Sequence, residues 1–285
     1  MQSAYRPWLI AALTHRPLPP LPAGPDPAVA AAIVDCARND GVLLLLEQAM
    51  AAHPDAAAVP AAVREAVQAA ARSGLFDQLA MLSEQRKALQ ALSGAGLRFL
   101  VLKGGALAHW LYAKPHLRLV TDLDILLPDK ACIAEAAAAL AGIGYVQVTG
   151  NPVANELSFH KPGGPYGRFI VDAHWRLFNR ALLRDAFGFD ELAGGAIELP
   201  AMHGIKGLGP VHALFNACGH RALSLPHRQI TGIQRADCLR WLWDIHALAL
   251  RFSADEWRQV TRLAGEKRIS AILQEALQTT GAAFG

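Results

Sequence analysis

The sequence has few cysteines, and their spacing is not that of a metal site. The 285 residues include four, Cys36, Cys132, Cys218 and Cys238, which lie far apart and form no Cys-x-x-Cys pair. Zinc knuckles and disulfide frameworks need closely and regularly spaced cysteines. We therefore expect reduced, structural thiols, and the sequence argues against a zinc-knuckle protein and a disulfide-stabilised secreted domain.

Long hydrophobic runs are also missing. The apolar segment 8–13 is far shorter than the roughly 20 residues that span a bilayer, and only one arginine precedes it. The composition, 53% hydrophobic and 18% charged with a net charge of +3, is typical of a globular protein. We expect a soluble, cytoplasmic protein without membrane contact. Its weak positive charge suits an anionic substrate such as a nucleotide better than the wrapping of nucleic acid.

Two familiar nucleotide-binding loops are absent. The chain has no Gly-x-x-x-x-Gly-Lys-Ser/Thr loop and no Gly-x-Gly-x-x-Gly turn after a strand. The first loop cradles phosphates in P-loop enzymes, and the second binds dinucleotides in Rossmann domains. The sequence therefore argues against both of these nucleotide-binding folds.

The motif between Phe99 and Leu127 is the most informative part of the chain. An apolar strand, expected over 97–102, runs into Gly104 and Gly105, which open a helix. The N–H groups at a helix start point outward, and glycine allows a phosphate to approach the backbone closely. A plain strand–turn–helix connection explains the two glycines equally well.

Two aspartates on the next apolar strand, expected over 121–127, carry more weight. Asp122 and Asp124 are two residues apart, so on a strand they project from the same face. Carboxylates among apolar neighbours repel each other and lose hydration unless a cation lies between them. Hard divalent ions such as Mg²⁺ take oxygen ligands of this kind. The alternative is an exposed edge strand with solvated carboxylates, which the apolar neighbours disfavour.

A third carboxylate lies in a later apolar strand, expected over 168–176. Asp172 would complete a set of metal ligands from a neighbouring strand. His174 falls on the same face, where it would meet the nucleotide or orient a carboxylate; a hydrogen-bonded histidine at the sheet surface is an equal alternative. Trp175 points the other way, toward the core.

Two cations flank the aspartate and glycine motifs. Arg118 precedes the aspartate pair, and Lys103 precedes the glycines. We expect both to hold phosphate oxygens, because guanidinium and ammonium groups pair with phosphate. The alternatives are a surface charge for Arg118 and, for Lys103, an ion pair with a carboxylate at the end of the strand.

Together these motifs resemble the signature of the DNA polymerase β-type nucleotidyltransferase superfamily. The runs 102–108, 122–126 and 171–176, with Arg118, are similar to those of an uncharacterised bacterial nucleotidyltransferase family. Antitoxin-linked nucleotidyltransferases also share the Gly-Gly turn and the arginine before the aspartates. One departure is Gly105, where many superfamily members have a serine whose hydroxyl serves the phosphates.

The resemblance implies an NTP bound through Mg²⁺, with two ions and with Mn²⁺ as an alternative. It implies that Asp122 and Asp124 are catalytic metal ligands. It also implies that Asp172 is a third metal-binding carboxylate, which helps to deprotonate an acceptor hydroxyl. The implied nucleotide-binding residues are Lys103, Gly104, Gly105, Arg118 and His174.

The expected fold is α+β, a small mixed β-sheet nucleotidyltransferase core with helical N-terminal and C-terminal parts. The central elements follow the order β-α-β-α-β-β-β and end in a hairpin around 162–167. We expect an N-terminal helical region (1–96), a nucleotidyltransferase α/β core (97–178) and a C-terminal helical domain (179–285). In the first region, helices are expected over 27–52, with a break near 39–41, and over 60–92. The second would have an apolar stripe of Leu75, Leu79, Leu82 and Leu89.

The C-terminal helices carry polar residues at helical spacing. His212, Asn216 and His220 are four apart, and we expect a polar seam against the next helix rather than a metal or substrate face. Arg240 and Asp244 have the same spacing and are expected to pair with each other, with nucleotide or acceptor binding as the alternative. The tryptophans expected in the core rather than under a base are Trp241 and Trp243.

The sequence thus predicts a Mg²⁺-dependent enzyme that transfers an NMP from an NTP to a hydroxyl acceptor and releases pyrophosphate. ATP is the favoured NTP, and the acceptor is a small molecule, a peptide or protein, or an RNA end. The alternatives are a catalytically inactive nucleotide-binding or partner protein and a metal-dependent phosphohydrolase, in which water replaces the acceptor. The three aspartates Asp122, Asp124 and Asp172 together favour an active enzyme.

Overall fold

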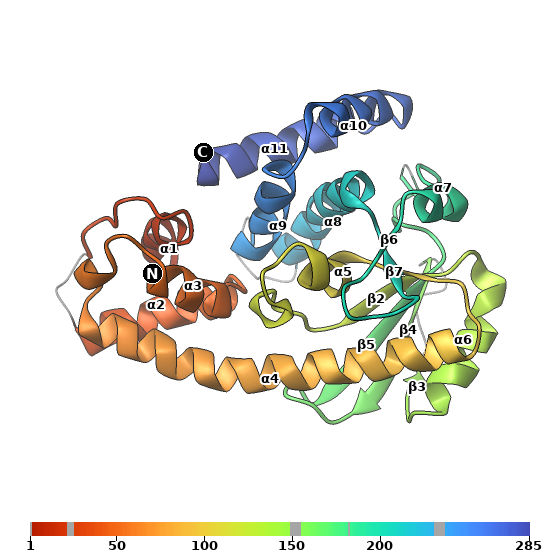
Figure 1. The fold of residues 1–285 in the computed structure, drawn as a ribbon, viewed down its shortest axis with the longest axis horizontal. Coiled ribbons are helices and arrows are strands. Elements are labelled where there is room, and N and C mark those ends of the chain that lie inside the picture. The colour runs from red at the N-terminus through yellow and green to blue at the C-terminus, as the bar shows by residue number, and fades with distance from the viewer. Residues whose placement is uncertain (1, 22–25, 149–154, 182, 231–236) are drawn as a thin grey trace.

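The computed structural model describes residues 2–21, 26–148, 155–181, 183–230 and 237–285. It confirms the expected α+β class, with a mixed sheet between helical N-terminal and C-terminal parts (Figure 1). In this part of the chain, no helix is long and apolar enough to cross a membrane.

The N-terminal part is helical, as expected. Its α-helices are α1 (Arg6–Leu13), α2 (Pro27–Asn39), α3 (Leu43–Ala51) and α4 (Ala61–Gly94). Helix α2 starts with a proline after Asp26, whose carboxylate caps the helix by accepting a hydrogen bond from Ala28 N. The predicted break after α2 is confirmed: Gly41 has a φ of +70°, a conformation that favours glycine.

Seven strands form one sheet in the described structure, in the order β3-β4-β5-β2-β1-β7-β6. The strands are β1 (Leu100–Val101), β2 (Leu123–Leu126), β3 (Val146–Gln147), β4 (Glu156–Pro162), β5 (Arg168–His174), β6 (Ile197–Glu198) and β7 (Lys206–Gly207). Strands β4 and β5 form the expected antiparallel hairpin, and β2 runs parallel to β5. The second of these pairings places Asp124 directly opposite Asp172.

The strand that carries the aspartate pair is shorter than expected. Strand β2 begins at Leu123, so Asp122 lies in the bend before the strand rather than within it. The sheet also continues beyond residue 178, because β6 and β7 add to its edge next to β1. The division into regions 1–96, 97–178 and 179–285 stays a prediction.

The remaining α-helices cover the sheet and close the chain. They are α5 (Lys103–Trp110), α6 (Ile133–Ala141), α7 (Phe189–Gly194), α8 (Pro210–Ile230), α9 (Leu239–Ala249), α10 (Ala254–Glu266) and α11 (Ser270–Phe284). Short 3-10 turns lie at Gln2–Tyr5, Ala56–Ala58, Pro115–Leu117 and Lys130–Cys132.

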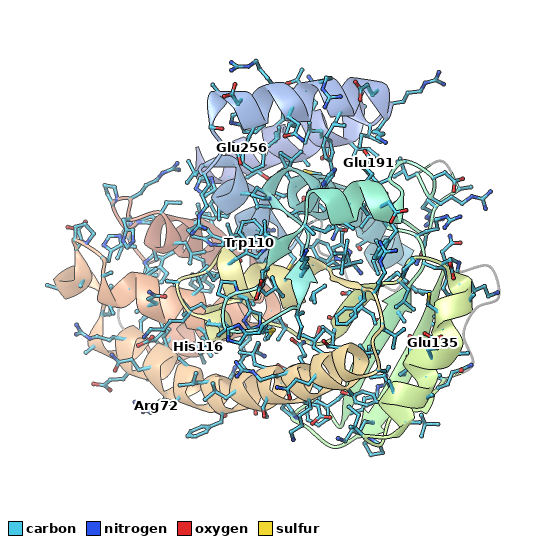
Figure 2. All side chains as sticks on the ribbon, turned by 45° about the vertical axis from the view of Figure 1, so that its right-hand side comes forward. Arg72, Trp110, His116, Glu135, Glu191 and Glu256 are labelled. Carbon is cyan, nitrogen blue, oxygen red and sulfur yellow. The ribbon has the colours of Figure 1, made fainter. Side chains whose placement is uncertain are left out.

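Side chains on alternate strand positions pack into two different cores. Leu100 and Leu126 join the cluster that contains α8 and α9, whereas Val101 and Ile125 join the cluster under α4 and α6. Trp110 packs against both clusters, and side chains fill the space between helices and sheet (Figure 2). The two faces of β1 and β2 are therefore both buried, as expected for a continuous apolar run.

The long helix α4 connects the N-terminal helices to the sheet. It runs along one side of the molecule, from α2 and α3 to α6 (Figure 1). Its apolar stripe differs from the prediction, since Leu79 is 48% exposed while Gln78, Glu84 and Gln85 are buried. The inner face of α4 therefore presents polar side chains to the sheet.

Candidate active site

Strand pairing brings the predicted carboxylates together. Asp124 on β2 lies opposite Asp172 on β5, and Asp122 precedes β2 by one residue. Burial and the neighbouring Asp124 raise the pKa of Asp122 above its usual range. Burial, with added repulsion from Asp124 and Asp122, raises the pKa of Asp172 to about 6. The three carboxylates are therefore close enough to repel one another.

Of the three carboxylates, Asp124 is the one that contacts Lys103 and His174. It is 4% exposed, and its Oδ1 lies 2.6 Å from Lys103 Nζ and 2.8 Å from His174 Nε2. Burial alone would raise the pKa of Asp124, but the Lys103 ammonium and His174 outweigh burial and hold that pKa well below its usual range. His174 also places its Nδ1 3.1 Å from Glu156 Oε2. The alternative predictions for Lys103 and His174, an ion pair and a hydrogen-bonded histidine, describe these contacts.

Asp172 has a hydroxyl partner from the hairpin. Ser158 lies opposite Asp172 in the β4–β5 ladder, and its Oγ donates a hydrogen bond to Asp172 Oδ1. A hydroxyl donor favours the charged carboxylate but only partly offsets the burial. Asp172 thus combines a fixed orientation with a pKa suited to accepting a proton near neutral pH.

Lys103 starts helix α5 in a strained backbone conformation. Its φ is +46°, in the left-handed region that costs L-residues about 1–2 kcal/mol. Burial lowers the affinity of the Lys103 amine for its proton, but Asp124 reverses this effect and raises the pKa. Strained residues of this kind concentrate at functional sites, where surrounding contacts hold them.

Arg118 is buried and ion-paired rather than exposed. Its guanidinium is held on two sides by Asp244, with Nη2 2.6 Å from Oδ2 and Nε 2.9 Å from Oδ1. Tyr112 donates a second hydrogen bond to Asp244 Oδ1 at 2.6 Å. The predicted pairing of Arg240 with Asp244 is therefore wrong. Arg240 instead donates to the Leu119 carbonyl oxygen at 3.3 Å.

The two glycines of the motif are both buried under side chains. A Cβ at position 104 would lie 2.9 Å from Arg118 Nη1, and one at position 105 would lie 3.2 Å from Val101. Close packing therefore accounts for glycine at both positions. The expected backbone contacts of Gly104 and Gly105 with phosphate stay a prediction.

We expect Gly104→Ala to destabilise the protein by about 1–3 kcal/mol, the cost of overpacking a filled site. The new methyl group would press on Arg118, which Asp244 prevents from moving away. Thermal unfolding measures the effect. Gly281→Ala is the matched control, since its Cβ meets no atom within 4 Å. The control should unfold at the same or a higher temperature, because alanine favours a helix by up to about 1 kcal/mol. Equal loss in both variants would contradict the packing argument.

Two adjoining cavities meet at these residues. The larger, of about 980 Å³, is lined by Lys103, His174, Glu156 and Thr121, by α2 residues such as Arg38 and Asn39, and by Arg180. The smaller, of about 210 Å³, contains Asp122, Asp124, Gly104 and Arg118. Both cavities are lined by Lys103, Asn216, His220, Arg240 and Trp241. In the described chain, Asp172 borders the carboxylates from β5 rather than lining these two cavities.

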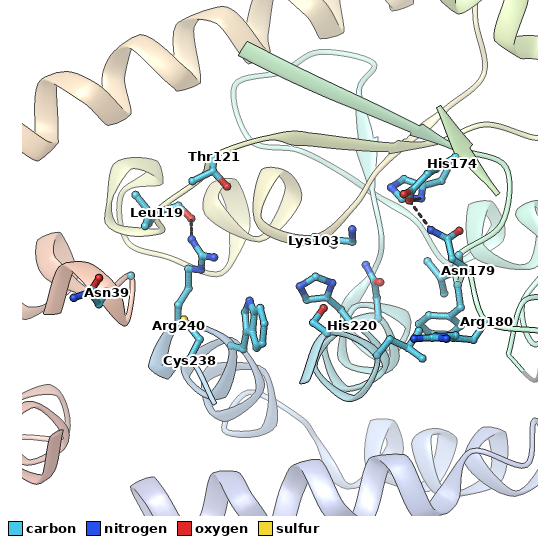
Figure 3. A pocket seen from close by; sticks show the side chains of 18 of the residues that line it. Asn39, Lys103, Leu119, Thr121, His174, Asn179, Arg180, His220, Cys238 and Arg240 are labelled. Atoms are coloured by element: carbon cyan, nitrogen blue, oxygen red, sulfur yellow. Dashed lines mark hydrogen bonds and ion pairs between the residues drawn. The ribbon is translucent and has the colours of Figure 1, made fainter. Parts of the chain in front are cut away.

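On the wall formed by α8 and α9, Asn216, His220 and Trp241 make an uncharged patch beside the charged Arg240. Lys103 and His220 lie near each other in the larger cavity (Figure 3). Burial and the nearby Lys103 ammonium lower the pKa of His220 to about 3, so its imidazole is neutral. The ring lies edge-to-face on Trp241, with centroids 5.1 Å apart. Asn216 is 2% exposed, and within the described part of the chain its Oδ1 has no hydrogen-bond partner.

This wall corrects the predictions for the C-terminal helices. His220 packs against α9 as a seam residue would, but Asn216 and His220 also face the cavities. His212 lies elsewhere, edge-to-face on Phe187 at 5.6 Å. Trp241 lines both cavities rather than lying in the core. The unpaired Asn216 Oδ1 marks a place for a ligand donor, because buried polar atoms rarely stay unpaired.

The side chains around the three carboxylates bear on whether the site suits a divalent cation. Among the described residues, no group of three or more His, Cys, Asp or Glu side chains is arranged to hold a metal ion. The contacts of Asp124 with Lys103 and His174 both fall on Oδ1, and the Lys103 ammonium neutralises the carboxylate, as a bound metal ion would. Burial, with repulsion between the carboxylates, raises the pKa values of Asp122 and Asp172. The chemistry of these oxygen ligands fits a hard divalent cation.

The sequence matches a known protein family over most of its length. The family described as uncharacterised nucleotidyltransferase matches residues 26–285. The chain belongs to this family. The family description supports nucleotidyltransferase activity for the chain. A comparison with curated proteins finds no match.

Several site residues were missed in the sequence. Ser158 and Glu156 contact Asp172 and His174, but nothing near them in the chain marks them as site residues. Gln78 and Gln85 contact the segment before β2, and their signal was spacing: two amides seven residues apart fall on one face of a helix. Asn216 was recognised on its helical face but assigned to a seam.

Proposed function

We propose that this nucleotidyltransferase moves an NMP from an NTP to a hydroxyl acceptor and releases pyrophosphate. The observation that carries the proposal is the convergence of three carboxylates beside a cavity, two on neighbouring strands and one in the bend before β2. Asp124 and Asp172 are opposite each other in the sheet, and Asp122 lines the smaller cavity. Phosphoryl-type transfer needs positioning and charge neutralisation rather than a covalent protein intermediate, which suits such a site.

Asp122, Asp124 and Asp172 would hold Mg²⁺, or Mn²⁺, in this proposal. Bound there, the ions would supply Lewis-acid stabilisation of the negative charge that develops during the displacement. Lys103 now neutralises Asp124 and would pass to the triphosphate once the carboxylate has another cation. Arg240 also faces the cavities, and its Nε has no hydrogen-bond partner among the described residues, so we propose it as a second group for phosphate oxygens.

Asp172 is the proposed proton acceptor. The acceptor hydroxyl gives its proton to Asp172, and its oxygen forms a bond to the α-phosphorus. The bond between that phosphorus and the oxygen bridging to the β-phosphate breaks, and pyrophosphate leaves with the electron pair. The pKa of about 6 for Asp172, caused by burial and neighbouring carboxylates, makes it a competent base at neutral pH.

The two walls of the cavities suggest where the substrates lie. The charged wall of Asp122, Asp124 and Lys103 would hold the phosphates. The uncharged patch of Asn216, His220 and Trp241 would take the nucleoside, with Asn216 Oδ1 accepting a hydrogen bond from it and Trp241 offering a ring. We propose ATP as the NTP. The acceptor, a small molecule, a peptide or protein, or an RNA end, would enter the wider cavity.

Calorimetric binding of each of the four NTPs in the presence of Mg²⁺ tests the substrate assignment. The wild type should bind at least one NTP, and Asp122→Asn and Asp124→Asn should each weaken metal-dependent binding. Pyrophosphate release together with a new NMP ester on an acceptor would support transfer. Pyrophosphate release with free NMP as the product would identify a hydrolase instead. Absence of binding of every NTP to the wild type would contradict the proposal.

A further inference from the structure

The backbone segment that leads into β2 is held by side chains rather than by a neighbouring strand. Residues 119–122 belong to no strand in the described structure, although Asp122 lies at the site. Buried backbone groups need hydrogen-bond partners, so a segment without a strand partner must find them elsewhere. The Leu119 carbonyl oxygen accepts hydrogen bonds from Arg118 Nη1 at 2.5 Å and Arg240 Nη1 at 3.3 Å.

The side-chain amide of Gln78 on α4 forms hydrogen bonds with both backbone polar groups of Val120. Val120 N donates to Gln78 Oε1 at 2.8 Å, and Gln78 Nε2 donates to the Val120 carbonyl oxygen at 3.2 Å. The side-chain amide thus replaces the paired donor and acceptor that a neighbouring strand would offer. Gln78 is fully buried at 0% exposure, so water does not compete for either bond.

Gln85 also donates a side-chain hydrogen bond to this backbone segment, next to the site. It lies seven residues after Gln78, two helical turns along the same face of α4. Its Nε2 donates to the backbone carbonyl oxygen of Asp122 at 2.8 Å, and the residue is 4% exposed. The bond fixes the main chain of the residue whose carboxylate lines the smaller cavity.

We infer that Gln78 and Gln85 are positioning residues that set the place of Asp122 through the backbone of residues 120–122. The inference rests on the proposed metal-binding role of Asp122. Packing alone does not require glutamine here, because the same face of α4 buries Met81, Ala88 and Leu89. The amides contribute what apolar side chains cannot: partners for a buried backbone that has no strand beside it.

Asp122 needs such support because it lies in the bend before β2, outside the sheet ladder. Its carbonyl oxygen accepts a hydrogen bond from Gln85 instead of from a neighbouring strand. Groups that orient a metal ligand from behind typically change metal affinity about 10- to 100-fold when they are removed. The α4 amides occupy this role for Asp122.

The test measures Mn²⁺ affinity by electron paramagnetic resonance, without nucleotide. Gln85→Met keeps most of the side-chain volume but removes the donor to the Asp122 carbonyl oxygen, and we expect Mn²⁺ binding to weaken about 10- to 100-fold. Gln90→Met is the matched control, because Gln90 lies on the exposed face of the same helix, and it should leave the affinity unchanged. Circular dichroism confirms folding; Gln85→Asn, one methylene shorter, replaces Gln85→Met if that variant does not fold.

A double-mutant cycle identifies Asp122 as the group through which Gln85 acts. In an Asp122→Asn background, Gln85→Met should weaken Mn²⁺ binding by less than about twofold, because the ligand that it positions is already lost. An unchanged affinity in a folded Gln85→Met variant would overturn the inference. So would an equal loss in both backgrounds, or a wild type that binds no Mn²⁺. The predicted coupling in a protein that transfers no nucleotide would contradict the proposed function alone.

Discussion

Asp122→Asn is expected to reduce nucleotide transfer at least a thousandfold while leaving the fold intact. The carboxylate is a proposed metal ligand, and its loss would remove about 4 kcal/mol of transition-state stabilisation. The metal-free variant should unfold at the same or a higher temperature than the wild type. At neutral pH, burial and Asp124 make the ionised form of Asp122 unfavourable in the folded state, and asparagine removes this penalty. Initial rates and thermal unfolding, measured on the same preparations, check both parts.

The control for this prediction is Asp129→Asn, a nearby aspartate on the exposed surface. Its side chain caps a 3-10 turn by accepting from Ala131 N and Cys132 N, away from both cavities. Transfer by this variant should match the wild type, with at most a small loss of stability. Full activity in Asp122→Asn, or a large drop in its unfolding temperature, would contradict the site as described.

Asp244→Ala is expected to destabilise the protein by about 3–5 kcal/mol, because it leaves Arg118 charged, buried and unpaired. Arg118 and Asp244 are 6% and 3% exposed, so water cannot replace the lost carboxylate easily. The change also removes the acceptor of the Tyr112 hydroxyl. Differential scanning calorimetry should show a fall of about 10 °C in the unfolding temperature.

An exposed ion pair provides the comparison for Asp244→Ala. Asp190 lies 3.0 Å from Arg98, with side chains 88% and 68% exposed. Solvent screens such pairs, so Asp190→Ala should cost at most about 1 kcal/mol. An Asp244→Ala variant as stable as Asp190→Ala would show that Arg118 does not depend on its buried partner.

The sequence predicted that Asp124 and Asp172 lie close together because the relevant signals are local. Alternation around Asp122 and Asp124 indicated one face of a strand, and the apolar run around Asp172 indicated a second strand. The parallel pairing of β2 with β5 confirms that Asp124 and Asp172 come together. A strand period and a buried carboxylate are readable without any knowledge of distant contacts.

Contacts between segments that are distant in the sequence cannot be predicted from local spacing. Helical spacing suggested that Arg240 pairs with Asp244, since four residues apart is the natural distance within a helix. The actual partner, Arg118, lies 126 residues away in sequence and reaches Asp244 through the packing of α9 against the segment before β2. Local spacing describes which pairs are available, and tertiary packing selects among them.

The buried face of α4 was mispredicted for a related reason. Leucines such as Leu79 suggested the core-facing stripe, yet the polar Gln78 faces inward and Leu79 is largely exposed. Hydrophobicity identifies a core face only where the opposite surface is apolar. Here the opposite surface is a backbone segment outside the sheet, whose polar groups require hydrogen bonds rather than apolar contact.

The most direct test of the central claim follows the phosphates of the NTP. Purified protein, Mg²⁺ and extract fractions as acceptor source are incubated with NTP labelled at either the α- or the γ-phosphate. The account predicts that the α-label enters an acceptor while the γ-label leaves as pyrophosphate, and that Asp122→Asn and Asp124→Asn abolish both. Entry of the γ-label into an acceptor, or release of inorganic phosphate from a labelled NTP without transfer of the α-label, would contradict NMP transfer.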